Sequence, residues 1–372
     1  MKIGINAFAL GTGGGGIETY VRNVISGLGT IDPTGDYTIF LQPYRTADAI
    51  PRTKHLRRVV VQTRYGPLRV PFASALAIAR SRVDLMHVQN TAPALCPSPV
   101  VVTLHDIAYE RYPQFLPPDH VATLRRRVPP TLRRAAAIIT DSEASKREIV
   151  DYYRVLPDKV TVALLAADPI FRPLRDEAMR VVTRQRFADG ERYILFAGDP
   201  LQRRKNVKTL VDAYVRLRRA GAIAHRLVLS GGRDALASDI FAAVRATGHE
   251  GDLGFVGRVS DEELVALYNG ADLLVYPSFY EGFGLPPLEA MACGTPVITS
   301  NVSSLPEVVG DAALTVDPFD VDALATAIAR VLRDPELGAR LSAQGVARAA
   351  SFSWEATART ILRVYRQVLA PL

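Results

Sequence analysis

Two glutamates that stand eight positions apart, Glu281 and Glu289, flank a glycine-bearing turn. The apolar run at 273–277 predicts a strand before them, and the run at 288–292 predicts a helix. One carboxylate would follow the carboxyl end of the strand, and the other would lie in the first turn of the helix. Backbone N–H groups between them can bind phosphate, while carboxylates accept hydrogen bonds from hydroxyls. This place in an open α/β sheet favours a sugar nucleotide as the ligand.

A basic segment, Arg203, Arg204 and Lys205, follows the predicted strand Tyr193–Ala197 and precedes the predicted helix Val207–Leu217. Cations at the start of a helix are often only a solvated surface. Here they lie at the carboxyl end of a strand, and the positive end of the helix dipole adds to their charge. Together with the paired glutamates, they favour the binding of a diphosphate.

A glycine cluster at 11–16 joins the predicted strand Lys2–Ala7 to the predicted helix Ile17–Leu28. Its spacing fits the G-x-G-x-x-G pattern of dinucleotide-binding proteins. The next strand, however, ends at 40–42 without an acidic residue that could bind a ribose, and no Walker lysine follows the glycines. We favour a loop whose N–H groups approach a phosphate. An NAD-dependent oxidoreductase remains an alternative.

His105 follows the apolar run Val100–Leu104 at the end of a predicted strand, where a packing role and a functional role are equally supported. Asp320 and Asp322 resemble a metal-binding pair, but they precede a helical run, which favours helix capping. No histidine and cysteine cluster has the spacing of a zinc site. We therefore expect neither a metal nor a cofactor.

Five arginines between Arg125 and Arg134 form a basic band in which apolar residues are interleaved. Peripheral contact with an anionic membrane surface and a solvated helix face are both consistent with this band. Pro129 and Pro130 would interrupt a continuous amphipathic helix here, which weakens the membrane interpretation.

Short apolar runs alternate with helical patterns along the chain, which predicts an α/β protein whose parallel sheets are covered on both faces. Two such series are separated by a polar stretch at 175–192. We expect two domains, 1–172 and 173–353. A last helix within 354–372 would pack back onto the first domain.

The bulk composition is that of an ordinary globular protein, with 48% apolar residues among 372. The net charge of +7 is too mild to predict a nucleic-acid partner. No apolar run of about 18 residues predicts a membrane span, and the start of the chain lacks the apolar core of a secretion signal. The two cysteines, Cys96 and Cys293, are far apart. We expect a reduced, cytoplasmic protein. A peripheral contact made by the basic band would be with the inner face of the membrane.

The segment Pro277–Val297 closely resembles the E-x7-E signature of retaining GT-B glycosyltransferases of family four. Weaker similarities at Gly15–Ile17, His105–Asp106, Arg204–Asn206 and Ser304–Glu307 extend the resemblance over most of the chain. The resemblance implies the GT-B fold, an α/β architecture of two Rossmann-like domains facing across a cleft. The N-terminal domain would bind the acceptor, and the C-terminal domain would bind the nucleotide-sugar donor.

The same resemblance assigns roles in donor binding to the signature residues. Glu281 would contact hydroxyls of the donor sugar, and Glu289 would hold the ribose hydroxyls. The backbone N–H groups near Phe283, Gly284 and Leu285 would contact the sugar and the diphosphate.

Residues outside the signature would complete the site by this resemblance. Arg204 and Lys205 would neutralise the diphosphate, and Gly15 and Gly16 would approach it from the other domain. His105 would lie near the transferred sugar.

The resemblance implies a retaining, metal-independent transfer of a hexose to a glycan or lipid-linked acceptor in cell-surface polysaccharide or glycoconjugate synthesis. The segments Val102–Ile107 and Pro277–Gly284 are similar to those of bacterial mannosyltransferase-like members, which favours GDP-mannose as donor. UDP-glucose, UDP-N-acetylglucosamine and dTDP-rhamnose remain open. Asp199 stands where many relatives carry an arginine, so the positive charge would come from the basic segment. A non-catalytic nucleotide-sugar-binding protein is a further alternative.

Overall fold

The computed structural model describes most of the chain. The described residues are 1–12, 15–42, 56–61, 70–93, 95–174, 176–232 and 245–370. They form two compact units, one made of Met1–Leu165 with Ser353–Leu372 and the other of Ala166–Phe352. No described helix is both long and apolar enough to cross a membrane.

The two units divide a few residues before the boundary expected after residue 172. Phe171 packs its ring against Tyr268 at a centroid distance of 5.7 Å, and the carbonyl of Arg172 accepts the Asn269 amide at 3.1 Å. These contacts make 166–172 part of the second unit.

The described part of the first unit contains a seven-stranded sheet in which all neighbouring strands are parallel, in the order β3-β2-β1-β4-β5-β6-β7. Its strands are β1 (Lys2–Asn6), β2 (Asp36–Leu41), β3 (Leu56–Val60), β4 (Leu85–Gln89), β5 (Val100–Thr103), β6 (Ala137–Thr140) and β7 (Val160–Val162). The side chains of β4 and β5 are almost entirely buried, as the apolar runs predict for a sheet covered on both faces.

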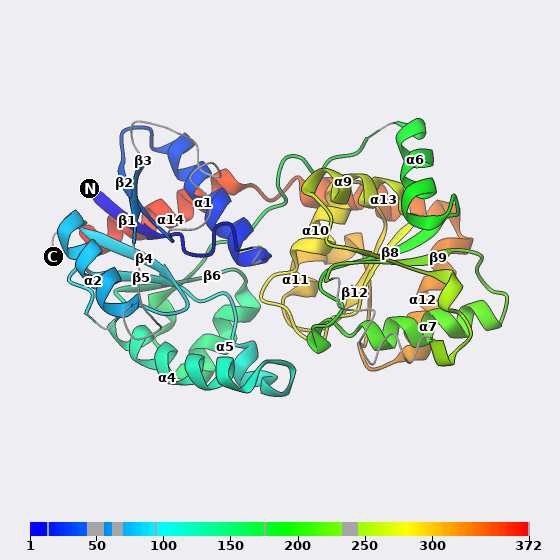
Figure 1. Cartoon of the computed structure of the whole chain (residues 1–372), viewed down its shortest axis with the longest axis horizontal. Helices are drawn as coiled ribbons and strands as arrows, with labels where there is room; N and C mark the ends of the chain where they lie inside the picture. The colour runs from blue at the N-terminus through cyan, green and yellow to red at the C-terminus, as the bar shows by residue number, and fades with distance from the viewer. Residues whose placement is uncertain are drawn as a thin grey trace. The chain divides into compact units, whose positions relative to one another are not determined.

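Helices cover both faces of this sheet, with α1 and α14 on one side and α4 and α5 on the other (Figure 1). The helices are α1 (Gly16–Ile31), α2 (Val70–Ser81), α3 (Ala108–Arg111), α4 (Pro118–Arg134), α5 (Glu143–Tyr153) and α14 (Trp354–Leu369). The last helix packs closely on α1, because a Cβ on Gly27 would lie 2.9 Å from the Cβ of Ala358 and 3.1 Å from the carbonyl oxygen of Trp354.

The described part of the second unit contains a six-stranded parallel sheet in the order β10-β9-β8-β11-β12-β13. Its strands are β8 (Tyr193–Ala197), β9 (Arg226–Ser230), β10 (Leu253–Gly257), β11 (Leu273–Tyr276), β12 (Val297–Ser300) and β13 (Leu314–Val316). Its helices are α6 (Glu177–Ala188), α7 (Val207–Arg219), α9 (Asp261–Gly270), α10 (Leu285–Ala292), α11 (Leu305–Val309), α12 (Val321–Arg333) and α13 (Pro335–Ala349). In Figure 1, α7 and α12 lie on one face of the sheet and α9, α10 and α13 on the other.

Helix α4 runs without interruption through Pro129 and Pro130, so the expected break in the basic band was wrong. The two prolines remove the hydrogen bonds that would reach the carbonyls of Arg125 and Arg126. Both of these arginines are exposed, so water can bond the freed carbonyls. The arginines of the band therefore lie on one continuous helix.

Candidate functional site

The centre of the candidate site is Glu281, a residue that is only 7% exposed in the loop after β11. Its Oε1 atom accepts hydrogen bonds from Lys205 Nζ at 2.7 Å, Ser278 Oγ at 2.8 Å and the Tyr276 hydroxyl at 3.1 Å. Arg204 Nη1 lies 2.7 Å from its other oxygen, Oε2. The two strand-end segments that the sequence singled out thus meet in one ion cluster.

The turn that carries the two cations is fixed to the rest of the second unit. Arg203–Lys205 forms a 3₁₀ turn that ends at Asn206, which has a left-handed φ of 55°. The Asn206 amide donates to the carbonyls of Pro277, at 3.0 Å, and Pro318, at 2.7 Å. Asparagine tolerates this backbone conformation, and its side chain holds the basic turn against the loop after β11.

The charges of this cluster keep Glu281 ionised. Burial alone would raise the pKa of Glu281, but the nearby charges of Arg204 and Lys205 outweigh it and lower the pKa to about 2. Lys205 is itself only 8% exposed and lies over the Tyr276 ring, 4.9 Å from its centroid. Two cations against one carboxylate leave the cluster with a net positive charge.

Two serines that the sequence did not single out individually hold the backbone around Glu281. Ser303 Oγ accepts the Glu281 N–H at 3.0 Å. Ser304 Oγ donates to the carbonyls of Glu281, at 2.9 Å, and Phe283, at 2.7 Å. The segment after β12 therefore fixes the loop after β11, and polar residues after adjacent parallel strands were the available signal for it.

The turn between the glutamates presents backbone N–H groups. Gly284 has a φ of 111°, which glycine adopts readily, and it precedes α10. The N–H groups of Phe283, Gly284 and Leu285 donate no hydrogen bond within the described residues. Pro286 and Pro287 carry no N–H, so the donors at this helix start are confined to those three residues.

Glu289 lies in a different electrostatic environment. Helix α10 begins at Leu285 rather than at 288. Glu289 therefore lies in its second turn, whereas the sequence predicted the first. Its Oε2 accepts the Tyr268 hydroxyl at 3.0 Å. Burial, and to a lesser extent the charges of Asp261 and Asp168, raise the pKa of Glu289 to about 7 against the opposing effect of that hydrogen bond. Unlike Glu281, this carboxylate gains and loses its proton near neutral pH.

His105, in the first unit, follows β5 and points its Nδ1 at Asp141 Oδ2, 2.7 Å away. The Tyr20 ring meets the His105 ring edge-on at a centroid distance of 4.8 Å. Burial would lower the pKa of His105, but the carboxylate of Asp141 raises it above its ordinary value. Burial raises the pKa of Asp141. The pKa values of both residues are therefore raised, which favours a proton held between them.

Comparisons with known proteins agree with the motifs. Residues 14–169 match the family described as "Glycosyltransferase Family 4", and residues 181–348 match "Glycosyl transferases group 1". The chain is 38% identical to O-antigen chain mannosyltransferase B of Escherichia coli, over 72% of this chain and 70% of that protein. The chain belongs to the GT-B glycosyltransferases of family four.

Further similarities extend this assignment. The glycosyltransferase is 31% identical to the serotype-specific mannosyltransferase WbdA of Escherichia coli, over 63% of this chain and 29% of that protein. Its structure matches sucrose-phosphate synthase from Thermosynechococcus elongatus with a TM-score of 0.80, at 25% identity, over 99% of both chains. The oxidoreductase alternative drawn from the first glycine cluster was therefore wrong, and the predicted GT-B architecture is confirmed.

The glycine loop of this glycosyltransferase lies before α1. Gly15 has a φ of 58°, and no atom of the described residues lies within 4 Å of where its Cβ would be. Gly11 donates its N–H to Glu18 Oε1 at 2.7 Å, which ties the loop to the helix. Gly13 and Gly14 lie outside the described residues. The approach of Gly15 and Gly16 to a phosphate stays a prediction.

A second histidine of the glycosyltransferase, His87, is part of a buried hydrogen-bond chain. Its Nδ1 lies 2.6 Å from the Tyr365 hydroxyl and its Nε2 lies 2.7 Å from Thr103 Oγ1. Thr103 Oγ1 is in turn 2.8 Å from the Tyr20 hydroxyl. Burial lowers the pKa of His87 to about 3, so the ring is neutral. These hydrogen bonds tie α14 to β4, β5 and α1, so His87 has a structural role.

Asp320 of the acidic pair caps the start of α12, as expected. Asp320 accepts the N–H groups of Asp322 at 3.0 Å and Ala323 at 2.8 Å. Asp199 likewise accepts the Leu201 N–H at 3.0 Å in the turn after β8. Within the described residues, no group of three or more histidines, cysteines or acidic residues could hold a metal ion.

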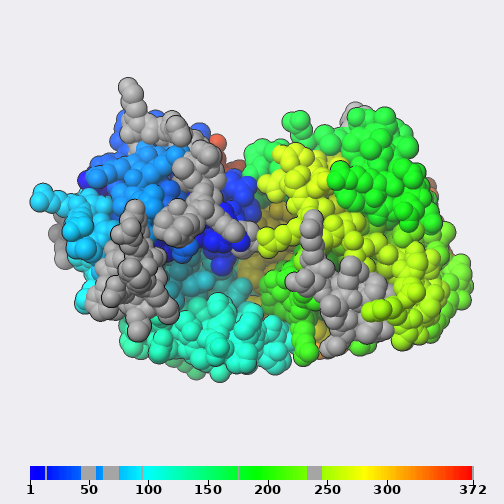
Figure 2. Space-filling view, in the orientation of Figure 1, coloured from blue at the N-terminus to red at the C-terminus, as the bar shows by residue number. Residues whose placement is uncertain are grey.

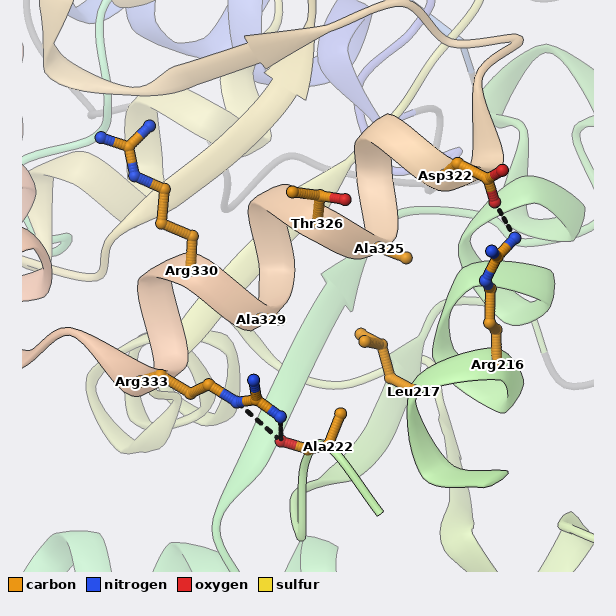
Figure 3. A pocket seen from close by; sticks show the side chains of 9 residues that line it. All are labelled: Arg216, Leu217, Ala222, Asp322, Ala325, Thr326, Ala329, Arg330 and Arg333. Atoms are coloured by element: carbon orange, nitrogen blue, oxygen red, sulfur yellow. Dashed lines mark hydrogen bonds and ion pairs between the residues drawn. The ribbon is translucent and has the colours of Figure 1, made fainter. Parts of the chain in front are cut away.

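A separate hollow of about 400 Å³ lies between α7 and α12 (Figure 3). Its lining residues are Arg216, Leu217, Ala222, Asp322, Ala325, Thr326, Ala329, Arg330 and Arg333. Arg216 pairs with Asp322, and Arg333 donates to the Ala222 carbonyl at 3.1 and 3.2 Å. No residue of the Glu281 cluster lines this hollow.

Proposed function

We propose that this glycosyltransferase transfers mannose from GDP-mannose to a glycan or lipid-linked acceptor during synthesis of a cell-surface polysaccharide or glycoconjugate. The names of the similar mannosyltransferases support the sugar. The observation that carries the proposal is the buried cluster of Glu281 with Arg204 and Lys205 beside the donor N–H groups of residues 283–285.

The cluster suits a sugar diphosphate because it combines a fixed carboxylate with excess positive charge. Oε1 of Glu281 already accepts three hydrogen bonds, so Oε2, which faces Arg204, is the oxygen that would accept a sugar hydroxyl. The charges of Arg204 and Lys205 and the backbone N–H groups would stabilise the negative charge that develops on the departing diphosphate. Fixed donors act most strongly where charge appears in the transition state.

Glu289 would bind the two ribose hydroxyls of the nucleotide. Hydrogen bonds from hydroxyls favour the ionised carboxylate, so binding would lower the pKa of Glu289 from about 7 and release a proton. The free site would thus hold Glu289 partly protonated near neutral pH, and the bound site would hold it ionised.

Retention and metal independence are further parts of the proposal. Arg204 and Lys205 supply the countercharge that a divalent cation supplies to phosphates elsewhere. The departing phosphate would accept the proton of the attacking hydroxyl, on the same face of the sugar. His105 would lie near the transferred sugar.

The experiment has three readouts on the full chain. Thermal shift with GDP, UDP and dTDP identifies the base of the donor. Assays with GDP-mannose and with UDP- and dTDP-sugars measure transfer, each with and without EDTA. NMR of the product identifies the anomer that is formed. We expect GDP and GDP-mannose to stabilise the protein, and transfer to be retaining and resistant to EDTA. A preference for UDP or dTDP would overturn the donor, and binding without transfer or hydrolysis would indicate a binding protein.

Variants connect this activity to the cluster. Glu281→Ala and Lys205→Ala should abolish transfer while the far-UV circular dichroism stays that of the folded protein. Lys208→Ala is the matched control, because the Lys208 side chain is 72% exposed and pairs with Asp212 on α7, away from the cluster. Near-normal turnover in either cluster variant contradicts the assignment.

Peripheral membrane contact through the basic band is also proposed. The arginines of the band lie on α4, which reaches the viewed surface in Figure 2. Arg126 and Arg127 are exposed to solvent. Arg126→Glu with Arg127→Glu should reduce co-sedimentation with anionic vesicles but not the binding of GDP. The matched control is Arg330→Glu with Arg340→Glu, two exposed arginines of the second unit. It should change neither the co-sedimentation nor the binding of GDP. Equal sedimentation with anionic and neutral vesicles would refute the contact.

A further inference from the structure

The His105 ring is held from two elements of the first unit. Asp141, directly after β6, bonds Nδ1 at 2.7 Å, and Tyr20 of α1 meets the ring edge-on. Ser145 in α5 donates to the His105 carbonyl at 3.2 Å and so fixes its backbone. Tyr20 is fixed in turn through its hydroxyl contact with Thr103. Such a support is more than one packing contact requires, and it defines the direction of the ring.

One nitrogen of this ring has no partner. His105 Nε2 is buried and makes no hydrogen bond within the described residues. A buried polar atom without a partner is uncommon, because its desolvation is not compensated. The carboxylate at Nδ1 places the proton on Nδ1, which leaves Nε2 of the neutral ring as a hydrogen-bond acceptor. His87 shows the contrast, since both of its nitrogens have partners within the unit.

We propose that Asp141 is a positioning residue of the glycosyltransferase: it fixes the His105 ring and its Nδ1–H tautomer so that Nε2 accepts a hydrogen bond from a substrate hydroxyl. This inference rests on the proposed function, in which His105 contacts the substrate. A carboxylate behind an imidazole sets its tautomer and orientation, and removal of such a carboxylate behind a metal-bound histidine commonly lowers affinity or activity about 10–100-fold.

The charged and titratable groups around His105 define the expected pH behaviour. Asp141 and Asp106 raise the pKa of the ring, while the neutral groups His87 and Tyr20 lie on the neighbouring β4 and α1. Protonation of Nε2 abolishes its acceptor role, so turnover should fall at acid pH as His105 is protonated. Asp141→Asn removes the charge that raises the pKa of His105 most. The acid limb of the pH profile of kcat should therefore move to lower pH.

The kinetic test compares Asp141→Asn, His105→Ala and the double variant. We expect Asp141→Asn to lower kcat about 10–100-fold and to leave the affinity for GDP unchanged. The double variant should be no slower than His105→Ala alone, because Asp141 acts only through His105. Asp252→Asn is the matched control: His249 Nδ1 lies 2.8 Å from Asp252 Oδ2 in the second unit, and turnover should not change.

A second readout does not depend on activity. NMR of ¹⁵N-labelled histidine in the full chain, with His105 assigned from its absence in His105→Ala, reports the tautomer and the pKa directly. We expect a proton on Nδ1 in the wild type and a lower pKa in Asp141→Asn. The role of Asp141 would be overturned by additive losses of kcat in the double variant, by an acid limb of the pH profile of kcat that does not move in Asp141→Asn, or by a proton on Nε2 of the neutral ring. Wild-type turnover in His105→Ala would overturn it too. Absence of transfer by the wild-type protein with every donor would instead refute the proposed function.

Discussion

Replacement of Glu281 by glutamine tests the ion cluster at the point where its charges balance. The amide keeps the shape of the side chain but leaves Arg204 and Lys205 facing each other without a counter-ion. The cluster lowers the pKa of Glu281 from 4.5 to about 2, and this difference corresponds to about 3 kcal/mol of preference for the ionised form in the folded protein. We therefore expect Glu281→Gln to unfold with a free energy about 3 kcal/mol lower at pH 7.

The pH dependence of this loss follows from the direction of the shift. A carboxyl group whose pKa is lowered by folding stabilises the protein above its ordinary pKa of 4.5. That contribution disappears as the pH falls from 4.5 towards about 2, where both states bind the proton. The difference between wild type and Glu281→Gln should therefore shrink from about 3 kcal/mol at pH 7 to about 1 kcal/mol at pH 3.

Urea unfolding followed by far-UV circular dichroism at pH 7, 5 and 3 measures these differences. Glu289→Gln is the matched control, since it removes the other buried glutamate of the same segment. The pKa of Glu289 is raised to about 7, so its stabilising contribution is lost as the pH rises from 4.5 to 7. Glu289→Gln should therefore gain stability relative to the wild type over that range. An equal loss for Glu281→Gln at pH 3 and pH 7 would refute the reasoning.

Three further predictions concern donor binding and support of the site. The affinity for GDP should rise between pH 6 and pH 8 as Glu289 ionises, and calorimetry should find this rise absent in Glu289→Gln. Gly284→Ala should cost about 1–3 kcal/mol in urea unfolding and weaken GDP binding, because φ is 111° and the new Cβ would lie 2.7 Å from Leu305 Cδ2. Tyr365→Phe leaves His87 Nδ1 unbonded and should cost about 1–3 kcal/mol. That cost should be constant from pH 5 to pH 8, because the pKa of His87 is about 3.

The strand and helix order of both units could be read from the sequence, because the apolar runs of buried parallel strands are distinct. The edge strands β7 and β13 were not predicted, since each has only three residues. The helical path through Pro129 and Pro130 was also missed. The residues whose carbonyls lose their helical partners, Arg125 and Arg126, are both exposed.

The residues of the candidate site could be predicted from the sequence, but the hydrogen bonds and ion pairs between them could not. Position after a strand identified Glu281 and the basic turn as neighbours of a ligand. Their direct pairing depends on the adjacency of β8 and β11, and chain order does not give adjacency. The hydrogen bonds of Ser303 and Ser304 to the Glu281 loop depend in the same way on the adjacency of β11 and β12.

The two glutamates look equivalent in the sequence, yet their surroundings give them opposite electrostatics. Cations supplied by the loop after β8 hold Glu281 ionised at any pH near neutrality, whereas burial and the negative charges of Asp168 and Asp261 hold Glu289 at its titration point. If Glu281 holds the sugar and Glu289 the ribose, the contact with the sugar is insensitive to pH and the contact with the nucleotide is not. A rise in pH from 6 to 8 should then lower the KM for the donor through Glu289. Any change in kcat over the same range would come from another group, of which His105 is the candidate in the first unit.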